Sequence, residues 1–143
     1  MNPIKVGLLG LGTVGRGTFE ILRRNQEEIQ RRAGRSIEIV QVAVRDMAKA
    51  RRVVGDAVAL SRDPEALVRH PGIDIVVELI GGLEPARTLI LAAMDNGKHV
   101  VTANKALLAE HGRELFNRAR KLGRSIAFEA SVGGGIPIIA AIG

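Results

Sequence analysis

The sequence contains no cysteine, tryptophan or tyrosine among its 143 residues, and only three phenylalanines. Without cysteine, a disulfide scaffold, a thiolate zinc site and catalysis by a cysteine nucleophile are excluded. The net charge of +6 could indicate a nucleic-acid partner. However, so few aromatic rings make a base-stacking surface hard to build, and the basic residues are spread as doublets along the chain. We therefore expect no nucleic-acid partner.

Long apolar runs are also missing. Asp74, Glu78 and the glycines near Gly81 interrupt the longest candidates, and a membrane helix needs about 18 or more apolar residues in succession. The apolar stretch after Lys5 contains several glycines and is followed by no signal-peptide cleavage site. With 46% hydrophobic and 25% charged residues, the composition is typical of one globular domain. We expect a cytoplasmic protein without a membrane partner.

Short apolar runs alternate with amphipathic segments of helix length, a pattern typical of a parallel sheet covered by helices. We predict an α/β fold of the Rossmann type: a doubly wound, mainly parallel sheet of about six strands with helices on both faces. The expected strands are 4–9, 37–44, 57–60, 73–79, 99–102 and 125–128. The expected helices are 14–32, 46–54, a short one from Asp63 and Pro64, 85–96 and 104–122. Because the sequence stops inside the apolar segment 136–142, we expect residues 1–143 to be one domain of a longer protein.

Gly10, Gly12 and Gly15 have the G-x-G-x-x-G spacing, directly after the first expected strand and before a helix. In that context the first glycine permits a tight turn, the second lets a pyrophosphate approach the backbone, and the third lets helix and strand pack closely. The amides of Thr13 and Val14, at the positive end of the helix dipole, would hold the phosphates. The alternative is a glycine-rich turn without a ligand. We expect dinucleotide binding.

The end of the second strand indicates which dinucleotide is bound. An acid there binds the ribose 2′-hydroxyl of NAD, whereas an arginine accommodates the 2′-phosphate of NADP. The sequence has Arg45 first and Asp46 next, with Lys49 one helical turn further on. We expect Arg45 to contact the phosphate and NADP to be the cofactor, with NAD possible. The alternative is that Arg45 is a solvated turn residue.

Lys105 follows the strand 99–102 and begins a helix, where the helix dipole disfavours a cation. It would lie at the carboxyl edge of the sheet, where ligands of open parallel sheets bind. A general-acid or proton-relay role beside the nicotinamide would explain this position. The alternative is an exposed lysine at a helix start.

Two acids lie at the same expected edge. Glu78 ends a strand and leads into a loop that could pass over the nicotinamide ribose, and Glu129 precedes the glycine-rich loop 131–135. A carboxylate with loop carbonyls suits a hard cation, whereas a capping acid and an ordinary loop are the alternative. His70, His99 and His111 have no metal-ligand spacing, and we interpret them as structural or solvated.

Four segments together resemble homoserine dehydrogenase: GLLGLGTVG at 7–15, VAVRD at 42–46, VTANKA at 101–106 and FEASVGGGIP at 128–137. They occur in the family's order and spacing over nearly the whole chain. The resemblance implies an NAD(P)-dependent oxidoreductase that interconverts L-aspartate 4-semialdehyde and L-homoserine, on the route to threonine and methionine.

The resemblance also implies roles for single residues. Thr13, Val14 and Arg45 match cofactor contacts, and Lys105 matches a lysine assigned to cofactor contact and proton relay. A site for a monovalent cation, namely sodium, would use Glu129 and the carbonyls of Val132, Gly134 and Ile136. Family members continue into a substrate and dimerisation domain that these 143 residues lack. We expect the full-length protein to be a homodimer, and this chain to bind cofactor with little or no turnover.

The sequence is also compatible with two other interpretations. One is a different Rossmann oxidoreductase acting on sugars or cyclic imines, although those enzymes usually place the lysine in a Glu-Lys-Pro context that residues 103–106 do not match. The other is a non-catalytic nucleotide-sensing domain, which would need neither Lys105 nor the Glu129 loop.

Overall fold

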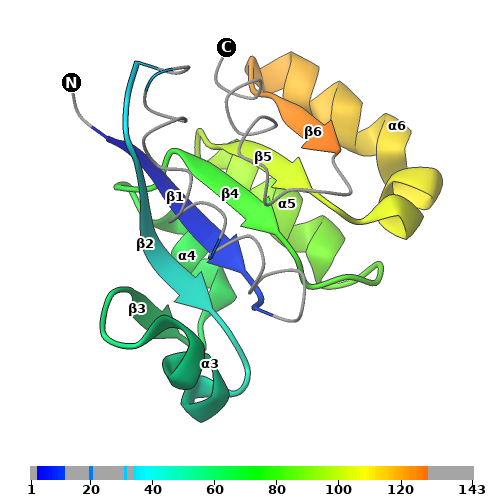
Figure 1. The fold of residues 1–143 in the computed structure, drawn as a ribbon. Helices are drawn as coiled ribbons and strands as arrows, with labels where there is room; N and C mark the ends of the chain where they lie inside the picture. The colour runs from blue at the N-terminus through cyan, green and yellow to red at the C-terminus, as the bar shows by residue number, and fades with distance from the viewer. Residues whose placement is uncertain (1–2, 12–19, 21–30, 32–33, 129–143) are drawn as a thin grey trace.

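The computed structural model of the chain describes residues 3–11, 20, 31 and 34–128. Within these residues, six strands form a single all-parallel sheet in the order β3-β2-β1-β4-β5-β6 (Figure 1). The order reverses between β1 and β4, which defines a doubly wound sheet of the Rossmann type and confirms the prediction. The strands are β1 (Ile4–Leu9), β2 (Ile37–Ala43), β3 (Ala59–Ser61), β4 (Ile75–Glu78), β5 (His99–Thr102) and β6 (Ile126–Phe128).

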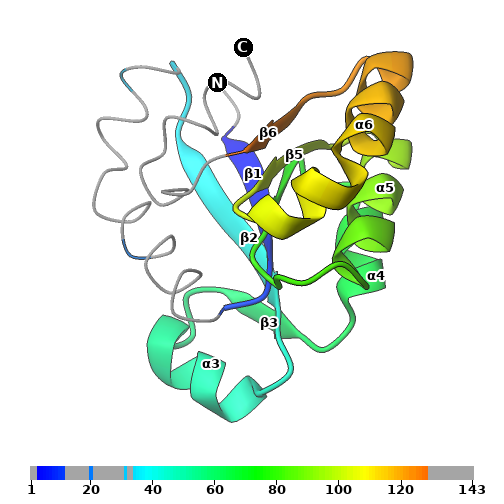
Figure 2. The same ribbon diagram turned by 90° about the vertical axis from the view of Figure 1, so that its right-hand side faces the viewer.

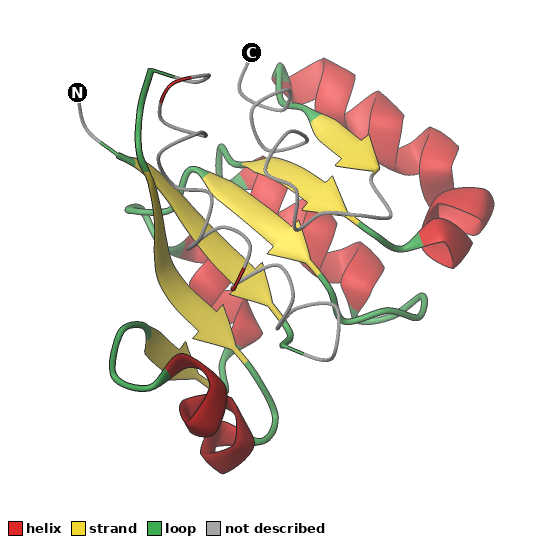
Figure 3. Cartoon of the chain, in the orientation of Figure 1, coloured by secondary structure: helices red, strands yellow, loops and turns green. Residues whose placement is uncertain are grey.

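Helices cover both faces of this sheet. Seen along the sheet in Figure 2, α4, α5 and α6 lie on one side and α3 lies on the other, and Figure 3 shows how helices and strands alternate along the chain. The bounds are α3 (Met47–Val54), α4 (Pro64–Arg69), α5 (Ala86–Asp95) and α6 (Lys105–Leu122). The helix expected over 14–32 lies outside the described residues, apart from Glu20 and Arg31, which are both helical. No helix in the described part of the chain is long and apolar enough to cross a membrane.

Side-chain caps fix where three of these helices begin. Asp46, Asp63 and Asn104 each accept a hydrogen bond from the backbone N–H three residues further on, at 3.0 Å in every case. Such a cap satisfies one of the amide groups that a helix start leaves unpaired. At the other end of α6, Gly123 adopts the left-handed conformation with φ 66°, which glycine accepts without a steric penalty. These capping residues explain why α3, α4 and α6 begin, and α6 ends, close to the predicted positions.

The two faces of the sheet bury separate apolar clusters. Along β1, Leu8 belongs to the cluster on the α3 side, which includes Val54. Its neighbour Leu9 belongs to the cluster on the α4–α6 side, which includes Ile90 and Leu115. This alternation follows from the two-residue period of a strand. Because β1 and β4 are apolar on both faces, they form the centre of the sheet.

Two strands begin two residues later than the sequence pattern predicts. Ala57, the expected start of the third strand, donates its N–H to the carbonyl of Val54 and closes the turn after α3, so β3 begins at Ala59. Ile73 similarly donates its N–H to the carbonyl of His70, and β4 begins at Ile75. In both places a local turn bond replaces a sheet bond that apolar character alone suggests.

Candidate functional site

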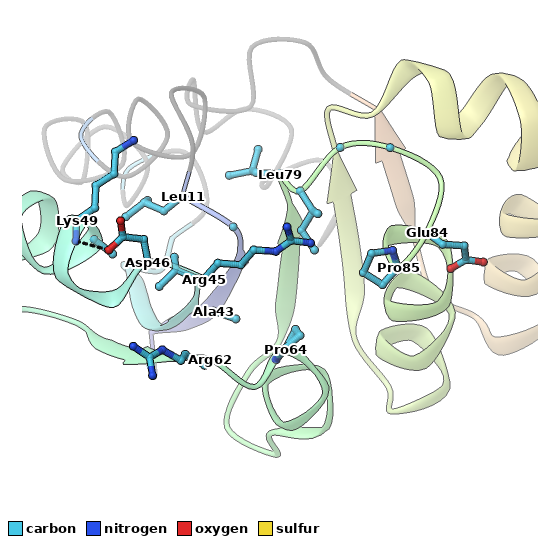
Figure 4. A pocket seen from close by; sticks show the side chains of 16 residues that line it. Leu11, Ala43, Arg45, Asp46, Lys49, Arg62, Pro64, Leu79, Glu84 and Pro85 are labelled. Atoms are coloured by element: carbon cyan, nitrogen blue, oxygen red, sulfur yellow. Dashed lines mark hydrogen bonds between the residues drawn. The ribbon is translucent and has the colours of Figure 1, made fainter.

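A cavity of about 760 Å³ opens at the carboxyl edge of the sheet (Figure 4). Its walls include residues that end or directly follow four neighbouring strands: 10–11 after β1, 43–46 at β2, Arg62 after β3 and 79–82 after β4. The first turn of α3 adds Lys49. The cavity therefore lies where the strand order reverses, which is where open α/β sheets bind their ligands. Its size is in the range of small-molecule and cofactor sites.

Gly10 makes the sharp turn out of β1 at the wall of this cavity. Its φ is 93°, a conformation that residues with a side chain rarely adopt. A Cβ there would also lie 3.3 Å from the backbone carbonyl of Leu79. The Gly10 N–H donates to the carbonyl of Ala43 at 2.8 Å, which continues the pairing of β1 with β2 up to the turn. The first glycine of the fingerprint thus has the conformational role that its position predicted.

Gly12, Thr13, Val14 and Gly15 lie outside the described residues. Their assignment as cofactor-binding residues stays a prediction.

Three basic side chains line the cavity: Arg45 at the end of β2, Lys49 in α3 and Arg62 after β3. Figure 4 shows the Arg45 side chain extended along the cavity. Among the described residues, none of the three forms an ion pair with a carboxylate. All three side chains are exposed. Their positive charges are therefore available to an anionic group in the cavity, and a planar guanidinium suits a phosphate particularly well.

Asp46 also lines the cavity, but α3 already uses its carboxylate. The Oδ1 atom accepts a hydrogen bond from the Lys49 N–H at 3.0 Å (dashed in Figure 4). Of the two residues that could select the cofactor, Asp46 therefore serves as a helix cap, and Arg45 has no carboxylate partner among the residues that the structure describes.

The loop after β4 forms the opposite wall, and Glu78 determines its shape. Its Oε2 atom accepts hydrogen bonds from the N–H groups of Ile80 and Gly81, at 2.9 and 3.0 Å. Gly81 and Gly82 both have positive φ, 82° and 71°, and the space beside them is open. Backbone conformation, rather than crowding, therefore requires glycine at these two positions.

Lys105 is the first residue of α6 and is exposed. It lies at the carboxyl edge of the sheet, as predicted, but it is not among the residues that line the cavity. The preceding residue connects it to the cavity wall, because Asn104 Nδ2 donates to the carbonyl oxygen of Gly82 at 2.6 Å. The start of α6 and the cavity loop are thus in direct contact. The catalytic role of Lys105 stays a prediction.

A model of one protein family matches residues 10–129, and its description is homoserine dehydrogenase, NAD binding domain. The chain belongs to this family. The homoserine dehydrogenase of Pseudomonas aeruginosa is 55% identical over 142 residues, which are 99% of this chain and 32% of that protein. A crystal structure of the homoserine dehydrogenase from Thiobacillus denitrificans superimposes with a TM-score of 0.86 at 58% identity, covering 90% of this chain and 30% of that one.

The S. aureus homoserine dehydrogenase gives a TM-score of 0.84 at 39% identity, over 92% of this chain and 33% of that one. The chain therefore spans about a third of the length of the homoserine dehydrogenases that it matches. An NAD-binding oxidoreductase from Klebsiella pneumoniae, at 23% identity and a TM-score of 0.73, shares the fold alone. As a homoserine dehydrogenase NAD-binding domain, the chain is of the type that binds a nicotinamide cofactor.

The cation site implied by the homoserine dehydrogenase resemblance is at the other end of the chain. Glu129, Val132, Gly134 and Ile136 all lie outside the described residues, so sodium binding stays a prediction. Within the residues that the structure describes, no group of three or more histidine or acidic side chains could hold a metal ion.

The three histidines have local partners. His70 Nδ1 accepts from the Gly72 N–H at 2.9 Å, and His99 Nδ1 accepts from the Ser125 N–H at 3.0 Å. His111 Nδ1 lies 3.8 Å from a Glu114 carboxylate oxygen. These contacts agree with the structural interpretation of the histidines.

Arg62 is the one basic residue of the cavity that the sequence argument missed. It directly follows the short edge strand β3, and Arg45 similarly lies soon after β2, two residues beyond its end. Because parallel strands end at one sheet edge, the residues that follow adjacent strands lie close together. That rule, applied to the edge strand as well as to the central ones, would have identified it.

Proposed function

We propose that this chain is the NADP-binding part of a homoserine dehydrogenase that interconverts L-aspartate 4-semialdehyde and L-homoserine, with NAD as a possible second cofactor. One observation carries the choice of NADP: Arg45, Lys49 and Arg62 line one cavity at the reversal of strand order, and none of them pairs with a carboxylate in the described part of the chain. A ribose 2′-phosphate is dianionic, or nearly so, and would be held by these cations. Residues 1–143 would form the cofactor-binding domain.

In this proposal each part of the cofactor has its own set of residues. Gly10, with Gly12 and Gly15, would bring the backbone close to the pyrophosphate, and the Thr13 and Val14 amides would donate to it. When bound, the nicotinamide supplies or accepts a hydride. Lys105 would act as the general acid that delivers a proton to the substrate oxygen, or removes it in the reverse direction.

The remaining expectations belong to the full-length protein. We place the amino-acid substrate and the dimer interface mainly in the two thirds of the relatives that this chain does not span. A sodium ion would be held by Glu129 and the carbonyls of Val132, Gly134 and Ile136. The activity would serve threonine and methionine synthesis in the cytoplasm. This chain alone would bind cofactor and turn over little or no aldehyde.

The direct test is a titration of the 143-residue chain with NADPH and with NADH, followed by nicotinamide fluorescence. We expect saturable binding of NADPH at lower concentration than NADH. If neither dinucleotide binds at millimolar concentration, the proposed cofactor site is wrong. Tighter binding of NADH would instead assign the preference to NAD.

Catalysis is tested in a chimera in which this chain replaces the matching third of the P. aeruginosa enzyme, to which it is 55% identical. We expect Lys105→Ala to lower kcat about 100-fold or more, the usual loss of a general acid or base, while NADPH still binds. The exposed Lys121 of α6 provides a matched control, and Lys121→Ala should keep full activity. A nucleotide sensor would show no dehydrogenase activity to lose.

A further inference from the structure

A buried acid and a buried hydroxyl face each other at the carboxyl edge of the sheet. Glu78 ends β4, Thr102 ends β5, and the two residues are paired in the parallel ladder. Both are 0% exposed. Thr102 Oγ1 donates to Glu78 Oε1 at 2.5 Å, while the other carboxylate oxygen accepts the two N–H groups of the cavity loop described above.

The same hydroxyl continues the connection to α6. Thr102 Oγ1 accepts a hydrogen bond from the Asn104 N–H at 3.0 Å. Asn104, which is 7% exposed, accepts the Leu107 N–H with its side-chain oxygen and donates its amide to the carbonyl of Gly82. The hydrogen bonds therefore form a ring that starts at the cavity loop, passes through Glu78, Thr102 and Asn104, and returns to that loop.

Packing alone does not require an acid at this position. The three residues before Glu78 in β4 are Ile75, Val76 and Val77, all completely buried, and a fourth aliphatic residue would continue the central strand. A buried carboxylate is costly unless its oxygens are fully hydrogen-bonded. Glu78 accepts three hydrogen bonds, two at Oε2 and one at Oε1, so both of its carboxylate oxygens are bonded. In a satisfied network of this kind the hydrogen bonds strengthen one another and hold their members rigidly.

We propose that Glu78 and Thr102 are positioning residues that couple the cavity loop to the first turn of α6, so that a dinucleotide in the cavity and the backbone of Lys105 influence each other. The cofactor part of this statement rests on the proposed function. The coupling itself is a property of the free protein. Neither Glu78 nor Thr102 lines the cavity, so they act through the loop and through Asn104.

The test uses Thr102→Val, which keeps the shape of the side chain and removes the hydroxyl, and Thr102→Ser, which restores the hydroxyl. The measurement is amide hydrogen exchange of the free 143-residue chain by NMR. Thr102 does not contact the amides of Ile80, Gly81 or Leu107 directly. We nevertheless expect all three to exchange about tenfold faster in Thr102→Val, and within about twofold of wild type in Thr102→Ser. This size corresponds to the loss of one hydrogen bond to a charged group.

The outcomes separate coupling from simpler explanations. Faster exchange that is confined to Asn104 would mean that Thr102 only caps its neighbour, and the proposal would be wrong. Equal acceleration at the Leu115 amide, in the buried middle of α6, would show a global loss of stability and would also overturn it. If Thr102→Val does not fold, Glu78→Gln provides the second variant. Its amide oxygen can still accept from the loop, but its NH₂ group would face Thr102 and could not accept the Thr102 O–H. Hydrogen exchange should therefore become faster at the Leu107 amide.

The cofactor arm distinguishes this inference from the proposed function. Saturating NADPH should shift the Leu107 amide signal in wild type and Thr102→Ser, and much less in Thr102→Val. If wild type binds no NADPH, the proposed function fails, and the exchange pattern of the free protein still decides whether the loop and α6 are coupled. If NADPH shifts Leu107 equally in Thr102→Val, the hydroxyl does not transmit its effect.

Discussion

Arg45 and Asp46 are adjacent residues of opposite charge, and the structure gives them different tasks. Asp46 caps α3 through its carboxylate, as its place just before a helix requires. Arg45 projects into the cavity without a carboxylate partner among the described residues. From the sequence we expect Arg45 to contact the phosphate and assign no cofactor role to Asp46. In the proposed function, cofactor choice would therefore depend on which of these two charges remains available to the ligand.

We expect Arg45→Ala to weaken NADPH binding by about 1.5–3 kcal/mol, the size of a lost hydrogen bond to a charged group, and to leave NADH almost unaffected. Isothermal titration of both dinucleotides measures the two losses. Arg113→Ala, on the exposed face of α6 and away from the cavity, is the control and should change neither affinity. Equal losses for NADPH and NADH would remove Arg45 from the 2′-phosphate role.

His99 should make the stability of the domain depend on pH. Burial lowers the pKa of His99 below its ordinary value of 6.5, the nearby Arg124 lowers it further, and Asp74 opposes both effects. Between the lowered pKa and about 6.5, the unfolded chain then binds more protons than the folded one. The free energy of unfolding should therefore fall as the pH decreases through that window.

Urea unfolding of wild type and His99→Gln at several pH values between 8 and 5 tests this. Both proteins share His70 and His111, so the difference between their curves isolates His99. We expect wild type to lose more stability than His99→Gln on acidification. A wild type that loses the same amount or less would contradict the lowered pKa.

At the scale of elements, most helices and strands of the described fold could be predicted from the sequence, because the residues that mark their ends lie next to them in the chain. The caps Asp46, Asp63 and Asn104 and the stop at Gly123 mark the helix ends. The ring through Glu78 and Thr102 was not predictable in this way. It depends on the register between β4 and β5, and a single sequence shows which strands exist but not which residues pair.

Lys98, just before β5, makes another contact between elements that the hydrophobic pattern of the sequence does not indicate. It is 2% exposed, and its Nζ donates to the carbonyls of His70 and Ile73, at 2.5 and 2.9 Å. It thereby joins the turn between α4 and β4 to the start of β5. Burial lowers the pKa of Lys98, while Asp74 acts in the opposite direction.

Lys98→Met keeps a side chain of similar length but removes the ammonium donor: the His70 carbonyl still accepts the Ile73 N–H, whereas the Ile73 carbonyl loses its bond to Lys98. We expect the free energy of unfolding to fall by about 1–3 kcal/mol, the usual cost of an unsatisfied buried polar group, as measured by urea denaturation. Lys121→Met, on the exposed surface of α6, should change stability by no more than about 0.5 kcal/mol. If Lys98→Met is as stable as wild type, the two hydrogen bonds contribute nothing net.

At the scale of the whole molecule, the cavity exists only in the folded chain. Its walls come mainly from the segments that follow β1, β2, β3 and β4 and from α3, and the sequence separates Gly10 from Pro85 by about 75 residues. The apolar cluster that holds α4, α5 and α6 against the sheet lies mainly away from these walls. A ligand of the cavity and a packing change in that cluster should therefore affect stability independently, since distant sites without shared partners are usually additive.

NADPH at 100 times its dissociation constant should raise the free energy of unfolding by about 2.7 kcal/mol, because it binds the folded chain and not the unfolded one. Ile90→Val, in the fully buried part of α5, should lower the starting stability by about 0.5–1.5 kcal/mol and leave the NADPH increment unchanged. Arg45→Ala should show the reverse: little change in starting stability, and a much smaller increment at the same NADPH concentration. Urea denaturation with and without NADPH measures all three proteins. An increment that Ile90→Val reduces as much as Arg45→Ala would mean that the cavity and the core on the α4–α6 side are not independent, because packing in that core would then control the shape of the cofactor site.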